Sequence, residues 1–161
     1  MKMKSKLFSS VLVAVVFVLC LAVDASVKAQ GVKAASRSET ATQQPRFREY
    51  RGVRLGMSVD EVRAKLGTPS MKYGDQDLFV ISENETAQIF YDSAQKVVTI
   101  SIDYLGGIGA PDYKAVVDGE LETTANGSLY KLVRYESQGF WASYHRTKSA
   151  VPTVTVTLQK I

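Results

Sequence analysis

Few residues of this chain have the type and spacing that catalysis or metal binding requires. His145 is the only histidine, and it lies next to Arg146 in an apolar stretch. A histidine-based metal centre needs several ligands at fixed spacing, so His145 cannot form one by itself. We interpret His145 as a surface residue of a strand. No set of Ser, His and Asp stands out from the background as a candidate for nucleophilic catalysis.

Two pairs of acidic residues could serve glycoside hydrolysis or calcium binding, namely Asp75 with Asp77 and Glu83 with Glu85. Both pairs fall in expected turns or at strand ends, where charged side chains are usually solvated. We therefore interpret all four as loop charges. The sequence predicts a protein that is not an enzyme and that has no catalytic residue, no metal and no cofactor.

The only cysteine, Cys20, lies inside an N-terminal apolar run and directly follows Leu19. Attachment of a lipid would require a small residue just before the cysteine, so we expect no lipid anchor. Once this run is removed, the chain has no cysteine, and it can then form neither a disulfide nor a thiol nucleophile.

The first residues have the pattern of a secretory signal peptide. Three lysines precede the apolar run from Leu7 to Ala22, and small residues follow it, which predicts a signal peptide over residues 1–29. An uncleaved anchor is the alternative, and it would be the chain's only link to a membrane. Residues 30–45 are rich in Ser, Thr, Ala and Gln without apolar periodicity, which predicts a disordered linker. Residues 46–161 then form one domain, which we expect to be periplasmic or secreted.

The net charge of +4 comes entirely from this leader. Six of the 20 basic residues and two of the 16 acidic residues precede Arg46, which leaves 14 of each in the domain. A nucleic-acid-binding domain usually carries a basic excess, so we exclude nucleic acid as a partner.

The stretch from Gly56 to Pro69 predicts a short helix with both ends defined. Ser58 is the expected N-cap, and Glu61 three residues later completes a capping box. Gly67 suits the left-handed position after the helix, and Pro69 prevents its continuation. The apolar positions recur at helical spacing, so one face of this helix must pack against something else.

A second, shorter helix is predicted over Pro111 to Asp118, after the glycine-rich joint at residues 106–109. Alternating or β-branched stretches predict six strands. They cover residues 77–82, 87–91, 97–104, 129–136, 140–146 and 153–160.

The resulting order is helix, three strands, joint, helix, three strands. It suggests a degenerate duplication of one αβββ unit, with halves at residues 46–105 and 110–161. We expect an α+β domain in which short helices pack on one face of a continuous antiparallel sheet.

The second half is rich in aromatic residues that could form a protein interface. On the strand at residues 140–146, Phe140 and Tyr144 share one face and Trp141 has the other. One face must be core, and the second could be an exposed aromatic patch. If this patch exists, we expect Trp141, Tyr144 and Tyr135 to contact a partner. The alternative is that Trp141 lies beneath a loop or the second helix.

The first half resembles the SmpA/OmlA (BamE-like) family, in which a short helix precedes strands with an aromatic-Asp turn. The matching residues are Gly56-Met57-Ser58, Val62, Leu66-Gly67, Pro69, Tyr91-Asp92 and Lys96-Val97. The tandem arrangement is more loosely similar to the β-lactamase-inhibitor-protein fold. This chain departs from the first family by lacking a lipid-attachment motif at Cys20 and by having a second half.

The resemblance implies a non-enzymatic protein-binding domain of the bacterial cell envelope that supports outer-membrane protein assembly, as in the assembly-factor branch of that family, or envelope integrity. A secreted enzyme inhibitor is the alternative that the tandem fold implies. A third class, a small hydrolase or lipid-binding domain, would require an apolar cavity between the helices and the sheet.

Overall fold

The computed structural model describes residues 44–161. The predicted signal peptide and almost all of the predicted linker lie outside the described residues. The first helix is present as α1, Val59–Leu66. Ser58 Oγ accepts a hydrogen bond from Glu61 N at 3.3 Å, and Glu61 Oε2 accepts one from Ser58 N at 2.8 Å. The predicted capping box is therefore confirmed. Gly67 ends the helix with φ 85° and ψ −156°, a positive-φ conformation that favours glycine but lies outside the left-handed helical region. The left-handed conformation that the sequence predicted for Gly67 is therefore wrong.

The strands form one eight-stranded sheet in which every neighbouring pair is antiparallel. They are β1 (Met71–Tyr73), β2 (Gln76–Ser82), β3 (Glu85–Tyr91), β4 (Val97–Leu105), β5 (Glu122–Thr123), β6 (Leu129–Tyr135), β7 (Phe140–Arg146) and β8 (Thr153–Lys160). Six of them match the predicted strands. The edge strands β1 and β5 were not predicted, because three and two residues are too few to show alternation.

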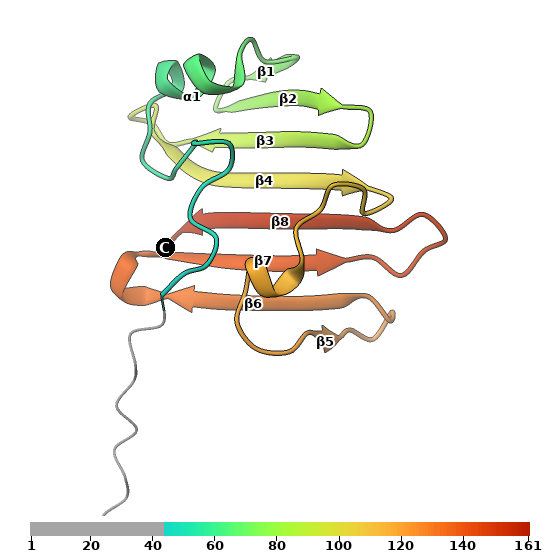
Figure 1. Ribbon diagram of the computed structural model, residues 1–161. Coiled ribbons are helices and arrows are strands. Elements are labelled where there is room, and N and C mark those ends of the chain that lie inside the picture. Colours follow the sequence, from blue (N-terminus) through green and yellow to red (C-terminus); the bar gives the residue numbers. More distant parts are fainter. Residues whose placement is uncertain (1–43) are drawn as a thin grey trace, which may run out of the picture. The chain divides into compact units, whose positions relative to one another are not determined.

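The strand order is β1-β2-β3-β4-β8-β7-β6-β5, so the last strand of each half meets at the centre of the sheet (Figure 1). There Ile102 of β4 is opposite Val156 of β8. Each half contributes four consecutive strands, of which one belongs to this central pair and three lie beyond it. The two halves are thus joined by main-chain hydrogen bonds and share one sheet, as a short sheet alone would be marginally stable.

The expected α+β class is wrong, because the molecule is mostly sheet and its described part has a single short α-helix. The helix predicted over Pro111 to Asp118 is reduced to a 3₁₀ turn, η1, Tyr113–Ala115. Val116 and Val117 are almost completely buried directly after this turn. A short segment that contains two adjacent β-branched valines has little intrinsic tendency to form an α-helix. A second 3₁₀ turn, η2, spans Glu136–Gln138 between β6 and β7.

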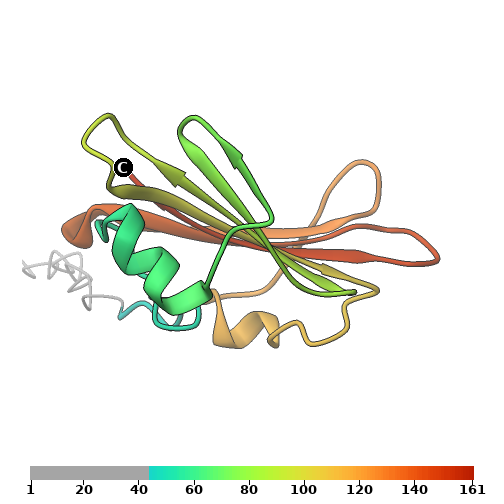
Figure 2. The same cartoon turned by 90° about the horizontal axis from the view of Figure 1, so that it is seen from above.

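One face of the sheet is covered by α1, by η1 and by the segment 44–57, which we call the strap. Figure 2 shows all three on the same side of the strands. Alternate strand residues point into this layer and form the core with the strap and α1. Its fully buried large side chains include Val53, Val62, Phe79, Ile89, Ile100, Ile102, Val116, Val117, Val156 and Leu158.

Two carboxylates attach the covering layer to the sheet. Asp77 of β2 is 2% exposed and accepts hydrogen bonds from Arg63 Nε at 2.9 Å and Nη2 at 3.0 Å. Our interpretation of Asp77 as a solvated loop charge is therefore wrong. Its position in β2 directs the carboxylate to the covered side, under α1.

The second attachment holds the strap at a tight turn. Tyr50 and Val53 exchange main-chain hydrogen bonds, and the two residues between them, Arg51 and Gly52, have φ of 49° and 78°. Arg51 Nη2 lies 3.0 Å from Glu85 Oε2, and the Tyr50 hydroxyl donates to Glu85 Oε1 at 2.7 Å. A positive φ is energetically unfavourable for a residue other than glycine, which here is Arg51. The bonds to Glu85 of β3 offset this cost.

Candidate functional site

The opposite face of the sheet carries no helix of the described chain (Figure 2). We call it the open face, and it consists of the strand residues that alternate with the core. On β2 to β4 and β6 to β8 they are Gln76, Leu78, Val80, Thr86, Gln88, Phe90, Thr99, Ser101, Asp103, Tyr130, Leu132, Arg134, Trp141, Ser143, His145, Thr153, Thr155, Thr157 and Gln159. All except Ser143 are at least partly exposed.

Strand register aligns these residues in rows across the sheet. One row runs Phe90, Thr99, Gln159, Trp141, Arg134, the next runs Gln88, Ser101, Thr157, Ser143, Leu132, and the third runs Thr86, Asp103, Thr155, His145, Tyr130. The centre of every row, on β4 and β8, is therefore polar. Larger apolar or aromatic side chains lie on both sides of it.

Some polar side chains at the centre of the open face form hydrogen bonds with one another. Thr155 Oγ1 donates to Asp103 Oδ1 at 2.6 Å, and the hydroxyls of Ser101 and Thr157 are 3.4 Å apart. Beside it, a hollow of about 500 Å³ is lined mainly by hydroxyl and amide side chains, together with Phe90, Tyr91, Val98 and the carboxylate of Asp75. This part of the face presents hydrogen-bonding groups, with one carboxylate at its edge.

The aromatic side of the open face lies on β6 and β7. The rings of Tyr130 and His145 meet edge to face with centroids 6.2 Å apart. Trp141 is partly exposed two rows away, between Arg134 of β6 and Gln159 of β8. His145 is partly exposed in β7, so it is a strand residue at the surface, as we interpreted it from the sequence.

The structure does not bring the three predicted interface residues together. Tyr135 and Tyr144 are 3% and 7% exposed and belong to the core on the covered face. Tyr144 packs against Tyr113 of η1 at 6.2 Å, and Tyr135 packs against Phe140 at 5.1 Å. Of the three, Trp141 alone lies on the open face.

Sequence reasoning did not single out the other large apolar or aromatic side chains of the open face, which include Leu78, Val80, Phe90, Tyr130 and Leu132. Alternation could have found Phe90, since its neighbours in β3 are apolar and point to the core. Alternation by itself does not say which of two mixed faces is covered.

Charge is sparse on this surface. Among the open-face residues, Asp103 and Arg134 alone carry a full charge at neutral pH, and Asp103 is hydrogen-bonded to Thr155. Few charged groups would have to lose their water if a partner covered the face.

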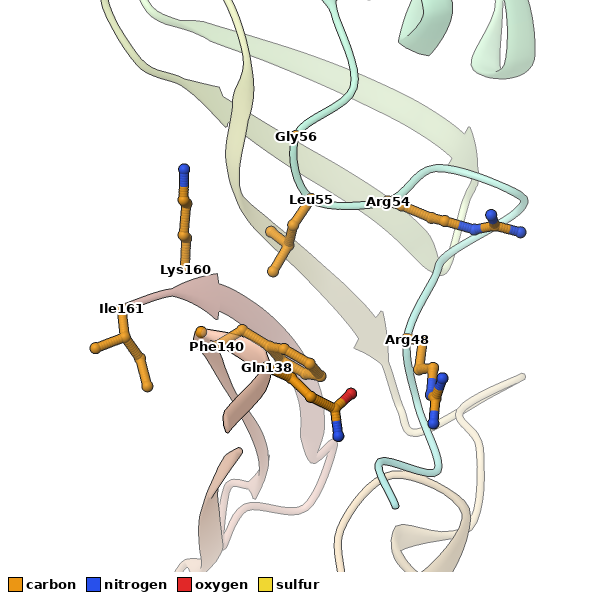
Figure 3. Close-up of a pocket in the computed structure, with 9 residues that line it drawn as sticks. Arg48, Arg54, Leu55, Gly56, Gln138, Phe140, Lys160 and Ile161 are labelled. Atoms are coloured by element: carbon orange, nitrogen blue, oxygen red, sulfur yellow. The ribbon is translucent and has the colours of Figure 1, made fainter. Parts of the chain in front are cut away.

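A second hollow lies on the covered side, where the strap passes the beginning of β7. We call it the cationic groove (Figure 3), and its volume is about 370 Å³. Its lining residues are Arg48, Arg54, Leu55, Gly56, Gln138, Gly139, Phe140, Lys160 and Ile161. Three of them are basic and none is acidic.

Within residues 44–161, no group of three or more His, Cys, Asp or Glu residues is placed to hold a metal ion. No helix in this part of the chain is long and apolar enough to cross a membrane. Comparisons with protein-family models, with characterised proteins and with solved structures found no match.

Proposed function

We propose that this chain is an exported, non-enzymatic protein-binding domain of the bacterial cell envelope, and that the open face is its binding surface. The observation that carries the proposal is the uncovered side of an eight-stranded sheet, with Trp141 and Tyr130 on one flank and Phe90 on the other. Export rests on the N-terminal sequence pattern.

The chemistry of the open face suits a protein partner. Protein interfaces are enriched in aromatic residues and arginine and depleted of other charged residues at their centres. Here Trp141 is next to Arg134, and hydroxyl and amide groups fill the centre of the sheet. Trp and Arg are also the residue types that most often dominate binding energy. The main chain beneath them is hydrogen-bonded in a sheet, so little ordering is needed on binding.

The partner class that we favour is an envelope protein, including components that assemble outer-membrane proteins, as the helix motif at residues 56–69 suggests. A secreted enzyme that the chain inhibits is the alternative. It is favoured by the same rigid face, because a surface that is already ordered suits tight inhibition. The identity of the captured partner separates these two functions.

The experiment is photo-crosslinking in the native cells, with a photoreactive residue placed at Gln88 or at Thr157 on the open face. The control position is Lys65, which is exposed on α1. We expect both open-face positions to capture the same partner and the control position to miss it. Equal capture from Lys65, or capture from no position, would contradict the proposal. A barrel-assembly component indicates the first function, and one secreted enzyme indicates the second.

Replacement of the aromatic anchor tests the same surface quantitatively. We expect Trp141→Ala to weaken binding of the captured partner by about 2 kcal/mol or more, roughly 30-fold in Kd. Ile108→Ala is the control, because Ile108 is large, apolar and 61% exposed in the turn after β4. Isothermal titration with the purified partner should show the loss for Trp141→Ala only.

A further inference from the structure

The floor of the cationic groove is apolar. Leu55 of the strap points toward Phe140 at the start of β7, and Ile161 flanks them (Figure 3). Phe140 is 9% exposed and fixed in the core, so it forms a rigid base. The volume of about 370 Å³ is at the small end of the range of about 300–1,000 Å³ that ligand pockets occupy. The groove therefore suits one extended apolar chain.

The rim of the groove is positive. Arg54 is neutralised by Glu49, whose Oε2 lies 2.6 Å from Arg54 Nε. Arg48 bonds to uncharged oxygens, the side chain of Gln44 at 2.5 Å and the carbonyl of Pro45 at 3.1 Å. Among the described residues, Arg48 and Lys160 form no ion pair. Lys160 and Arg48 thus lie on either side of the apolar floor, with their charged ends pointing away from it (Figure 3). Both side chains are long and exposed, so their charged ends can turn toward a ligand in the groove.

We propose that the cationic groove binds a fatty-acid anion. Its acyl chain lies against Leu55 and Phe140, and its carboxylate is held by Lys160 or Arg48. Charge complementarity selects an anion over an alcohol or a cation, since hydrogen bonds from charged donors to a carboxylate are about twice as strong as neutral ones. The small volume selects a single chain.

This site is separate from the proposed protein-binding face. Phe140 and Trp141 are neighbours in β7, and their side chains point to opposite sides of the sheet. Loss of fatty-acid binding therefore need not alter partner binding, and either proposal can fail without the other.

The probes are decanoate, decanol and decyltrimethylammonium, titrated into the purified exported chain by calorimetry. We expect one decanoate per chain, bound at least tenfold more tightly than decanol, and no binding of the ammonium compound. Equal affinity for decanol would overturn the proposal, since the positive rim would then have no role. Absence of decanoate binding would overturn it directly.

Nuclear magnetic resonance of the same chain locates the ligand. The amides of Gly139 and Ile161 line the groove, and Ile161 N donates to Gly139 O at 2.8 Å. Decanoate should shift both signals. The indole N–H of Trp141, the only tryptophan, should remain unchanged on the open face. The opposite pattern would place the ligand elsewhere and overturn the proposal.

A charge reversal tests the rim. Lys160 is exposed, so Lys160→Glu should leave the fold intact and weaken decanoate binding about tenfold or more. Lys72→Glu is the matched control, because Lys72 is an exposed lysine in the edge strand β1. If the two substitutions weakened binding equally, the net charge of the protein would explain the effect. That result would count against a binding site at Lys160.

Discussion

At the scale of single residues, Asp77 shows how a buried charge organises this fold. Its carboxylate accepts two hydrogen bonds from Arg63 and a third from the Tyr91 hydroxyl at 3.1 Å. The Arg63 side chain is 35% exposed, so one partner of the pair still reaches water. Pairs of this kind contribute modestly when intact and cost much more when one partner is removed.

We predict that Asp77→Ala lowers the free energy of unfolding by about 2 to 3 kcal/mol. The substitution leaves the Arg63 guanidinium and the Tyr91 hydroxyl without their acceptor under α1. The partial exposure of Arg63 should keep the loss below that of a fully buried pair. Urea unfolding followed by circular dichroism measures the change. Asp75→Ala, at an exposed position in the neighbouring turn, should change stability by less than about 0.5 kcal/mol.

Two core tyrosines should respond in opposite ways to loss of the hydroxyl. The Tyr135 hydroxyl is buried, and within residues 44–161 it has no hydrogen-bond partner. The Tyr91 hydroxyl donates to Asp77. We predict that Tyr135→Phe is neutral or stabilises by about 1 kcal/mol, whereas Tyr91→Phe destabilises by about 1 kcal/mol. Urea unfolding of the two variants measures both changes in stability. Destabilisation by Tyr135→Phe would indicate that the Tyr135 hydroxyl has a hydrogen-bond partner.

At the scale of elements, α1 depends on its cap, because eight residues are too few for a helix to be stable by itself. The main-chain and side-chain hydrogen bonds from Ser58 lower the pKa of Glu61. The stability that Glu61 contributes is therefore full above its unfolded pKa and is lost as the pH falls through the folded value. Acid should loosen the start of α1 before it affects the sheet.

We predict that Ser58→Ala lowers the free energy of unfolding by about 1 kcal/mol, since it removes the acceptor for the first turn of α1. Ser93→Ala is the control, because Ser93 is exposed in the turn between β3 and β4 and does not cap a helix. Amide hydrogen exchange should show faster exchange in α1 for the first variant. Unchanged exchange there would mean that the capping box does not stabilise the helix.

At the scale of the whole molecule, buried tyrosines connect stability to alkaline pH. Burial, followed by the nearby Glu85 carboxylate, raises the pKa of Tyr104 to about 12. Burial also raises the pKa of Tyr50 and of Tyr91. All three side chains point into the layer between the sheet and its cover. Ionisation of any of them would place a charge in this layer.

The direction in which stability changes with pH follows from the raised pKa of Tyr104 in the folded state. Tyr104 contributes stability that is full below its unfolded pKa of 10.0 and is lost as the pH rises toward 12. We predict a loss of about 2 to 3 kcal/mol from Tyr104 over this interval. Urea unfolding at a series of alkaline pH values measures it, with tyrosinate absorption as the titration signal. Tyr104→Phe should lose less free energy of unfolding at alkaline pH than the unsubstituted protein. An equal loss in both proteins would exclude Tyr104 as its cause.

The sequence by itself determined the local elements of this protein. Ser58, Glu61 and Gly67 mark the ends of α1, and alternation marks six of the eight strands, because caps and period-two patterns act between near neighbours. The prediction of a second helix was wrong, because a short segment with two adjacent β-branched valines, Val116 and Val117, has little intrinsic tendency to form an α-helix.

Only the tertiary structure decided which face of the sheet is covered. Both faces of β7 carry an aromatic residue, so alternation separates Trp141 from Tyr144 without saying which is core. Packing of Tyr113 of η1 against Tyr144 settles this, and the β4–β8 pairing then sets Trp141 and Phe90 on one open surface. These contacts join residues far apart in the chain, and local sequence patterns do not specify them.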